Sequence, residues 1–226
     1  MTDKKPIIKE FNLLLLGETN VGKTSIFERF INGTFTENKS ASIGIDFETK
    51  AFKNKQKNYK IHLYDTAGQE RFRSITQQYY KNAEGYFIVF DLSNENSLSA
   101  IQYWVDTIKE FSKESKFIIL GNKDDLTNKK ISDEVINDEL NKLKESENNK
   151  DLIYLKTSAK KNKNIIKAFE TMIDLLENEN IIQVEQKQEP KEKHKEKSKN
   201  NRSFLLNSKD HNISGKENKN KIDKCC

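Results

Sequence analysis

The chain has 226 residues, of which 33% are charged and 34% hydrophobic, and its formal net charge is +5 at pH 7. Residues 187–226 hold this excess, with twelve basic and six acidic side chains against 28 and 29 in the preceding 186 residues. A body without net positive charge does not favour nucleic-acid binding, and no apolar run approaches the roughly 20 residues that span a bilayer. The two cysteines, Cys225 and Cys226, are adjacent, which excludes a disulfide framework. We therefore expect a soluble intracellular domain with a basic tail.

Short apolar runs alternate with helical patterns along the body of the chain. Runs of four or five apolar residues are typical of strands buried on both faces of a parallel sheet, and they lie at 13–16, 86–90, 117–120 and 152–155. Residues 59–64 alternate between apolar and polar, as in a strand near a sheet edge. Apolar residues at helical spacing follow at 26–31, 98–111, 135–143 and 165–176. This order predicts a doubly wound α/β domain with its site at the carboxyl ends of the strands.

The apolar content falls sharply from about residue 180 onward. A Lys/Glu run to Lys199 and an Asn/Lys-rich stretch to Lys224 cannot offset the entropy cost of ordering the chain. We therefore divide the chain into a domain at 1–179 and a disordered basic tail at 180–226.

The first apolar run leads directly into Gly-Glu-Thr-Asn-Val-Gly-Lys-Thr at 17–24. This is GxxxxGK[ST] between a predicted strand and a predicted helix, which is the context that a phosphate-binding loop requires. Gly17 and Gly22 permit close backbone approach, so that N–H groups converge on phosphate oxygens at a helix N-terminus. Lys23 supplies a charge to the outer phosphates and Thr24 a hydroxyl to Mg²⁺. The alternative, a glycine turn beside an exposed lysine, leaves the flanking strand and helix unexplained.

Three further segments follow in order: Asp-Thr-Ala-Gly-Gln-Glu at 65–70, Asn-Lys-Asp-Asp at 122–125 and Ser-Ala-Lys at 158–160. With the phosphate loop they resemble the guanine-nucleotide-binding boxes of small Ras-like GTPases, over about residues 8–178. The resemblance implies an α/β P-loop NTPase (small G-protein) fold. In this fold a mostly parallel six-stranded sheet has one antiparallel edge strand and helices on both faces. It also implies binding of GTP or GDP with Mg²⁺.

The chemistry of the base agrees with this resemblance. Guanine offers two adjacent N–H donors that the Asp125 carboxylate can accept, whereas adenine would leave that charge unpaired. Phe35 matches the aromatic residue that packs edge-on against the base, although a core position would explain it equally. The resemblance implies metal ligation by Thr24, Ser42 and Asp65. The nucleotide-binding residues that it implies are Gly17, Thr19, Asn20, Val21, Gly22, Lys23, Thr24, Ser25, Phe35, Ser42, Asp65, Gly68, Asn122, Lys123, Asp125, Ser158, Ala159 and Lys160.

The resemblance also implies hydrolysis of GTP. Gln69 would orient the attacking water, and the Gly68 N–H would meet the γ-phosphate. No matching position supplies an arginine in cis, so turnover without a GTPase-activating protein (GAP) is expected to be slow, about 10⁻⁴–10⁻³ s⁻¹ by analogy with a known small GTPase. Ser42 stands where the family has threonine, which keeps the hydroxyl but loses a methyl that helps to close the loop. This departure leaves a second hypothesis, a GTP-binding effector scaffold with little or no hydrolysis.

Other segments resemble the Rab branch, which regulates vesicle traffic; they are 43–47, 70–76, 79–83 and the terminal Cys-Cys. The resemblance implies that Ile43, Phe47, Tyr64 and Tyr79 face effectors, although aromatic residues beside such loops also occur in cores. Tyr64 replaces the usual tryptophan. Cys225 and Cys226 match an ending that receives two geranylgeranyl groups, and two such chains anchor a protein where one is marginal. Unmodified thiols are the alternative.

Partners and location follow from the same resemblance. We expect a nucleotide exchange factor (GEF), a GAP, effectors, a GDP-dissociation inhibitor, a Rab escort protein and a geranylgeranyl transferase. We expect a monomer that does not bind nucleic acid. Its lipid anchor would hold it on the cytoplasmic face of endomembranes, with a soluble cytosolic pool bound to the inhibitor.

Overall fold

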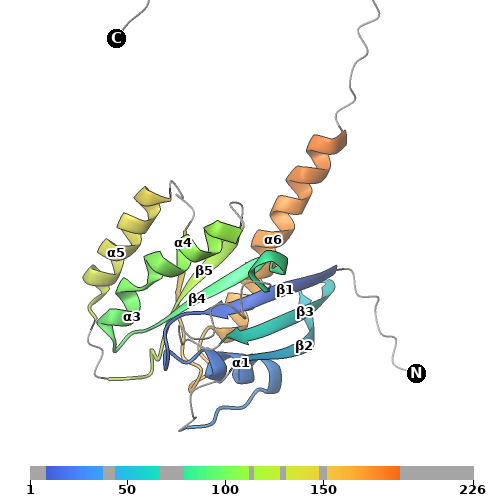
Figure 1. The fold of residues 1–226 in the computed structure, drawn as a ribbon. Coiled ribbons are helices and arrows are strands. Elements are labelled where there is room, and N and C mark those ends of the chain that lie inside the picture. Colours follow the sequence, from blue (N-terminus) through green and yellow to red (C-terminus); the bar gives the residue numbers. More distant parts are fainter. Residues whose placement is uncertain are drawn as a thin grey trace, which may run out of the picture. The chain divides into compact units, whose positions relative to one another are not determined.

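A computed structural model describes residues 9–37, 44–66, 79–111, 115–127, 131–147 and 152–188, and the side chains as far as residue 178. Helices and strands alternate along most of this length (Figure 1). In chain order they are β1 (Lys9–Leu16), α1 (Lys23–Asn32), β2 (Ile45–Asn54), β3 (Lys57–Thr66), β4 (Gly85–Asp91), α3 (Glu95–Ser99), α4 (Ile101–Phe111), β5 (Lys116–Asn122), α5 (Asp133–Ser146), β6 (Ile153–Lys156) and α6 (Ile165–Gln188).

The six strands form one sheet in the order β2-β3-β1-β4-β5-β6. The β2 strand pairs antiparallel with β3 and lies at the edge, and all the other neighbours are parallel. The apolar runs therefore lie in the parallel strands, as predicted, and the alternating segment 59–64 lies in β3. The predicted fold is confirmed. Its parallel strands place their carboxyl ends at one edge, where the loops of a site can meet.

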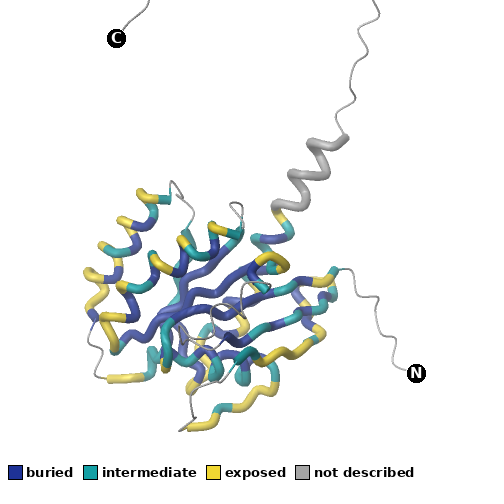
Figure 2. Tube along the Cα trace, in the orientation of Figure 1, coloured by how far each residue is buried: buried dark blue, intermediate teal, exposed yellow. Residues whose placement is uncertain are grey.

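The core lies in two layers, one on each face of the sheet. Successive residues of β1 point to opposite faces, so Leu13 and Leu15 pack with α1 and α6, while Leu14 and Leu16 pack with α4 and α5. Figure 2 shows β4 as buried throughout, and β5 is buried after its first residue. Burial of each such side chain contributes about 1.5–3 kcal/mol relative to exposure, which explains why these strands have apolar residues on both faces.

Two residues of the predicted apolar helix faces lie on the solvent side instead. Val135 is 50% exposed and Ile166 is 42% exposed, while their neighbours Ile136 and Ile165 are buried. Adjacent positions on a helix are about 100° apart, so a narrow apolar stripe buries only one of each pair. The α5 helix begins after an N-cap at Ser132, whose hydroxyl accepts the Val135 N–H at 3.4 Å.

The α6 helix continues to Gln188, nine residues beyond the boundary that the sequence predicts. The division into a domain and a disordered tail stays a prediction, because residues 189–226 lie outside the described part of the chain. None of the helices in the described part is both long enough and apolar enough to cross a bilayer.

Candidate functional site

Three loops meet at the carboxyl edge of the sheet, and the buried side chain of Asn122 joins them. Its Nδ2 donates to the carbonyl of Val21 in the loop after β1, at 2.9 Å. Its Oδ1 accepts the Ala159 N–H at 3.3 Å and the Thr157 hydroxyl at 3.4 Å, both from the loop after β6. Since Asn122 itself ends β5, one amide fixes the spacing of all three loops.

The loop after β1 requires glycine at two positions, because a Cβ would not fit there and because the backbone has a positive φ. A Cβ on Gly17 (φ +139°) would lie 2.1 Å from the carbonyl oxygen of Val89. A Cβ on Gly22 (φ +98°) would lie 2.4 Å from Nδ2 of Asn122. Asn20 also has a positive φ of 65°, which asparagine tolerates better than most residues. The loop therefore turns tightly, with its backbone close to β4 and β5, before α1 begins.

The side chain of Lys23, the first residue of α1, is almost entirely buried against this loop. Its side-chain ammonium donates to the carbonyls of Gly17 and Glu18, at 2.8 Å each. Burial lowers the pKa of Lys23 from 10.5 to about 8, although the nearby Asp65 carboxylate opposes the shift. A buried cation beside the N-terminus of α1 makes this loop a receptor for an anion such as phosphate.

Thr24 and Asp65 come together from two elements distant in the sequence. The Thr24 hydroxyl, in the first turn of α1, donates to Oδ2 of Asp65 near the end of β3, at 2.6 Å. Hydroxyl and carboxylate oxygens are hard ligands that fit Mg²⁺. In the described part of the chain, no group of three or more His, Cys, Asp or Glu residues could hold a metal ion. A metal here would thus need further oxygen ligands, and the third predicted one, Ser42, lies outside the described residues.

A pocket of about 310 Å³ opens next to the phosphate loop. Phe35 lines it and also packs against the apolar core, so the two interpretations of this residue are compatible. The residues around the pocket come from three loops and the start of α1: Gly22, Ser25, Phe35, Glu37, Asn122, Lys123, Asp125, Leu126, Ala159 and Lys160. The pocket thus combines apolar walls with a carboxylate, as a planar heterocycle with adjacent N–H donors would require.

Three contacts hold the polar groups of this pocket in place. The Ser158 hydroxyl donates to Oδ1 of Asp125 at 2.5 Å and accepts the Lys161 N–H at 3.0 Å. The ammonium of Lys123 pairs with Oδ2 of the buried Asp91 at 2.7 Å. Sequence reasoning missed Asp91, whose only signal is an acidic residue at the end of the apolar run that became β4.

A family model described as the Ras family matches residues 12–178. The chain belongs to the Ras family of small GTPases. It is also 37% identical over 163 residues to the GTP-binding protein ypt1 of Schizosaccharomyces pombe, an alignment that covers 72% of this chain and 77% of that protein. Membership of the Ras family implies guanine-nucleotide binding, which agrees with a phosphate loop that has a pocket for a base beside it.

Most of the site residues that the sequence predicts for this Ras-family chain lie around the loops described above. The described residues do not include Ser42, Ile43, Gly68, Gln69, Cys225 and Cys226, whose roles stay predictions. Three of the four predicted effector-facing residues form a cluster. The ring centroids of Phe47 and Tyr64 are 4.8 Å apart, and those of Tyr64 and Tyr79 are 5.2 Å apart. Phe47 is 49% exposed, so this end of the cluster is open to a partner.

The lowered pKa of Lys23 predicts a pH dependence of nucleotide affinity in this Ras-family protein. Bound phosphate favours the charged ammonium, so binding must take up a proton wherever free Lys23 is neutral. The dissociation constant for GDP should therefore rise several-fold between pH 7.5 and 9. Association and dissociation rates of a fluorescent GDP analogue (mant-GDP) at constant ionic strength measure this. Lys23→Arg keeps its charge throughout and should bind more weakly but with a flatter pH profile; equal slopes for both proteins would contradict the prediction.

Proposed function

We propose that this chain is a Rab-like molecular switch that binds GTP or GDP with Mg²⁺, hydrolyses GTP slowly and acts in vesicle traffic. One observation carries the proposal: a buried lysine, a hydroxyl–carboxylate pair and a largely apolar pocket that contains the Asp125 carboxylate lie next to one another at the carboxyl edge of the sheet. The similarity to ypt1, whose name describes it as a GTP-binding protein, and the Rab-like segments found in the sequence add to it.

In the proposed mechanism, phosphoryl transfer depends on positioning and on charge stabilisation. The loop N–H groups and Lys23 hold the phosphates, while Asp125 and Lys123 hold the guanine. Mg²⁺, held by Thr24, Asp65 and Ser42, would neutralise charge on the phosphate oxygens. Gln69 orients the attacking water and the Gly68 N–H contacts the γ-phosphate. Loss of the γ-phosphate would remove its contacts with Ser42 and Gly68, so the loops that carry these residues relax and hydrolysis becomes a change of shape.

The proposed switch acts at a membrane. Effectors bind the GTP form at Ile43, Phe47, Tyr64 and Tyr79. Geranylgeranyl groups on Cys225 and Cys226, added with an escort protein, anchor the basic tail to the cytoplasmic face of an internal membrane. An exchange factor, a GAP and a GDP-dissociation inhibitor complete the cycle. A scaffold that binds GTP without hydrolysing it is the second candidate, and Ser42 in place of threonine favours it.

Single-turnover hydrolysis of GTP separates these two candidates. Chain preloaded with γ-labelled GTP should release phosphate at about 10⁻⁴–10⁻³ s⁻¹ when Mg²⁺ is added. Gln69→Leu should slow this release at least tenfold and leave GTP affinity unchanged, because leucine cannot orient water. Gln56→Leu is the matched control, because Gln56 lies in the turn before β3, at the opposite end of that strand from Asp65. A wild-type rate no higher than that of GTP in buffer would favour the scaffold, and equal rates for both variants would remove Gln69 from catalysis.

A further inference from the structure

Arg29 joins the end of α1 to the loop that forms one wall of the base pocket. Its Nε donates to the carbonyl of Ala159 at 2.8 Å, and its Nη2 donates to that of Lys160 at 3.2 Å. Its Nη1 donates to the carbonyl of Gly33, at the C-cap of α1. One planar guanidinium thus holds backbone atoms of two separate segments, which a single ammonium cannot reproduce.

An ion pair closes the same pocket from the solvent side. The ammonium of Lys160 lies 2.6 Å from Oε1 of Glu37, and this hydrogen bond raises the pKa of Lys160. Both side chains line the pocket, together with Phe35. Glu37 belongs to the segment that follows α1, whereas Lys160 belongs to the loop after β6. The pair therefore connects the two walls between which a base would lie.

We propose that Arg29, Lys160 and Glu37 form a clasp on the base pocket that slows nucleotide release. A base leaves only when the Phe35 segment and the Ala159 loop separate, and both parts of the clasp oppose this separation. Arg29 acts as a positioning residue that fixes the Ala159 loop, and the Glu37–Lys160 pair closes the mouth. This inference depends on the proposed guanine-nucleotide binding.

The rate of mant-GDP release, measured with excess unlabelled GDP in Mg²⁺, tests the contribution of Arg29. Arg29→Lys keeps the charge but can satisfy only part of the three-carbonyl arrangement, so release should become about tenfold faster. Association should change little, because the phosphate loop is untouched. A variant that merely destabilises the fold would instead lower the unfolding temperature of the nucleotide-bound protein without this selective effect on release. An unchanged release rate for Arg29→Lys would overturn the role of Arg29.

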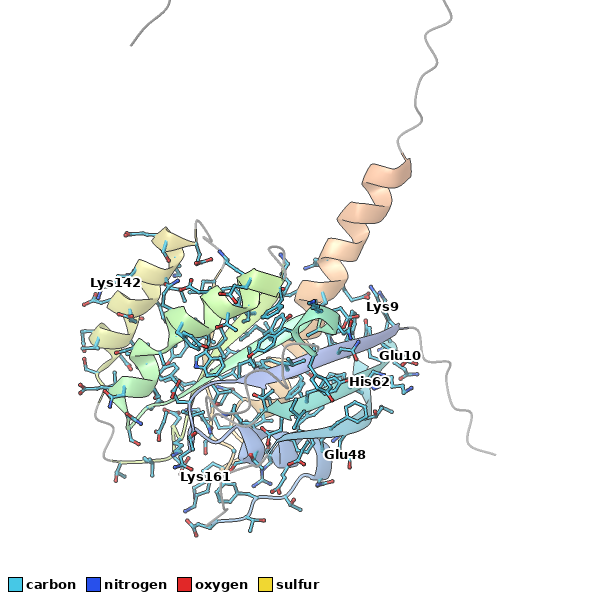
Figure 3. The ribbon with its side chains drawn as sticks, in the orientation of Figure 1. Lys9, Glu10, Glu48, His62, Lys142 and Lys161 are labelled. Carbon is cyan, nitrogen blue, oxygen red and sulfur yellow. The ribbon has the colours of Figure 1, made fainter. Side chains whose placement is uncertain are left out.

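A double-mutant cycle tests the ion pair, and exposed substitutions of this kind leave folding intact. Glu37→Gln and Lys160→Gln should each speed release by about two- to fivefold, and the double variant should release no faster than the faster single variant. The difference in release rate between each single variant and the wild type should disappear in 1 M NaCl, which screens exposed charges. Matched controls are Glu48→Gln and Lys161→Gln, two exposed residues outside the clasp that Figure 3 labels.

The outcomes separate this inference from the function on which it depends. Additive effects of the two substitutions, or equal effects of the control variants, would overturn the clasp while mant-GDP still binds. A wild-type chain that retains no mant-GDP would overturn the proposed function and the clasp together. Coupled effects at Glu37 and Lys160, with no effect of the control variants, would support the clasp.

Discussion

Asp125→Asn should change the preferred base from guanine to xanthine. The carboxylate of Asp125 accepts two N–H groups of guanine in the proposed complex, and an asparagine amide there can donate one bond in return. Xanthine has a carbonyl where guanine has its amine, so it suits the new donor. The Ser158 hydroxyl, which donates to Oδ1 of Asp125 at 2.5 Å, can donate equally to the amide oxygen and keep the side chain oriented. We expect GDP affinity to fall by roughly 10³–10⁴ and XDP affinity to rise.

Competition of GDP and XDP against a fluorescent nucleotide measures this change in base preference. Asp124→Asn is the matched control, because Asp124 lies in the same loop but pairs with Lys163 and does not line the pocket. It should retain its guanine preference. A variant at Asp125 that still bound GDP as tightly as the wild type would show that this carboxylate does not recognise the base.

The sequence predicts the sheet of this protein well for a physical reason. A strand buried on both faces must be apolar at every position, and few other short segments have that composition. The strands β1, β4 and β5 therefore stand out without any comparison. The edge strand β2 does not, because most of its residues are at least partly exposed and its apolar positions are few. Its antiparallel place came from the family resemblance and is confirmed by its pairing with β3.

The parts of the site within single loops could also be predicted from sequence, because local spacing determines which backbone N–H groups converge. Contacts between distant segments could not be predicted from the residues alone, and only the family resemblance brought Thr24 and Asp65 together as implied metal ligands. Arg29 and Ala159 are 130 residues apart, and Glu37 and Lys160 are 123 apart. An arginine on α1 or a glutamate after it is indistinguishable from any exposed charge until the fold places its partner. Asp91 escaped prediction for the same reason, since its partner Lys123 lies on the neighbouring strand end.

His62 is a residue to which the sequence gives no role and the fold gives several contacts. Its ring lies nearly parallel to that of Phe47, with centroids 5.8 Å apart. Its two nitrogens lie 3.0 Å from the Thr49 hydroxyl and 2.8 Å from a carboxylate oxygen of Glu10. His62, on the polar side of the alternating segment in β3, thus packs against Phe47 of the aromatic cluster. Alternation alone identifies such a strand but says nothing of what its outer face contacts.

Gly22→Ala should abolish tight nucleotide binding, with an effect of at least about 100-fold on GDP affinity. Two costs combine at this position. The backbone has φ +98°, which an alanine adopts only with strain, and the new Cβ would lie 2.4 Å from Nδ2 of Asn122. Asn122 must then move, and the same amide holds both Val21 and Ala159. One methyl group therefore disturbs the phosphate loop and the wall of the base pocket together.

Gly33→Ala is a control that separates the steric clash with Asn122 from the backbone strain of a positive φ. Gly33 also has a positive φ, +72°, but among the described residues no atom beyond Gly33 itself and its two chain neighbours lies within 4 Å of the Cβ that alanine would add. This control should lose about 1–2 kcal/mol of stability and keep nearly all of its GDP affinity. Isothermal calorimetry of nucleotide-free protein and thermal unfolding of each variant measure the two quantities. Equal losses of affinity at both positions would mean that backbone strain alone accounts for the effect. A loss confined to Gly22→Ala would make Asn122 the link through which the phosphate loop and the base pocket depend on each other.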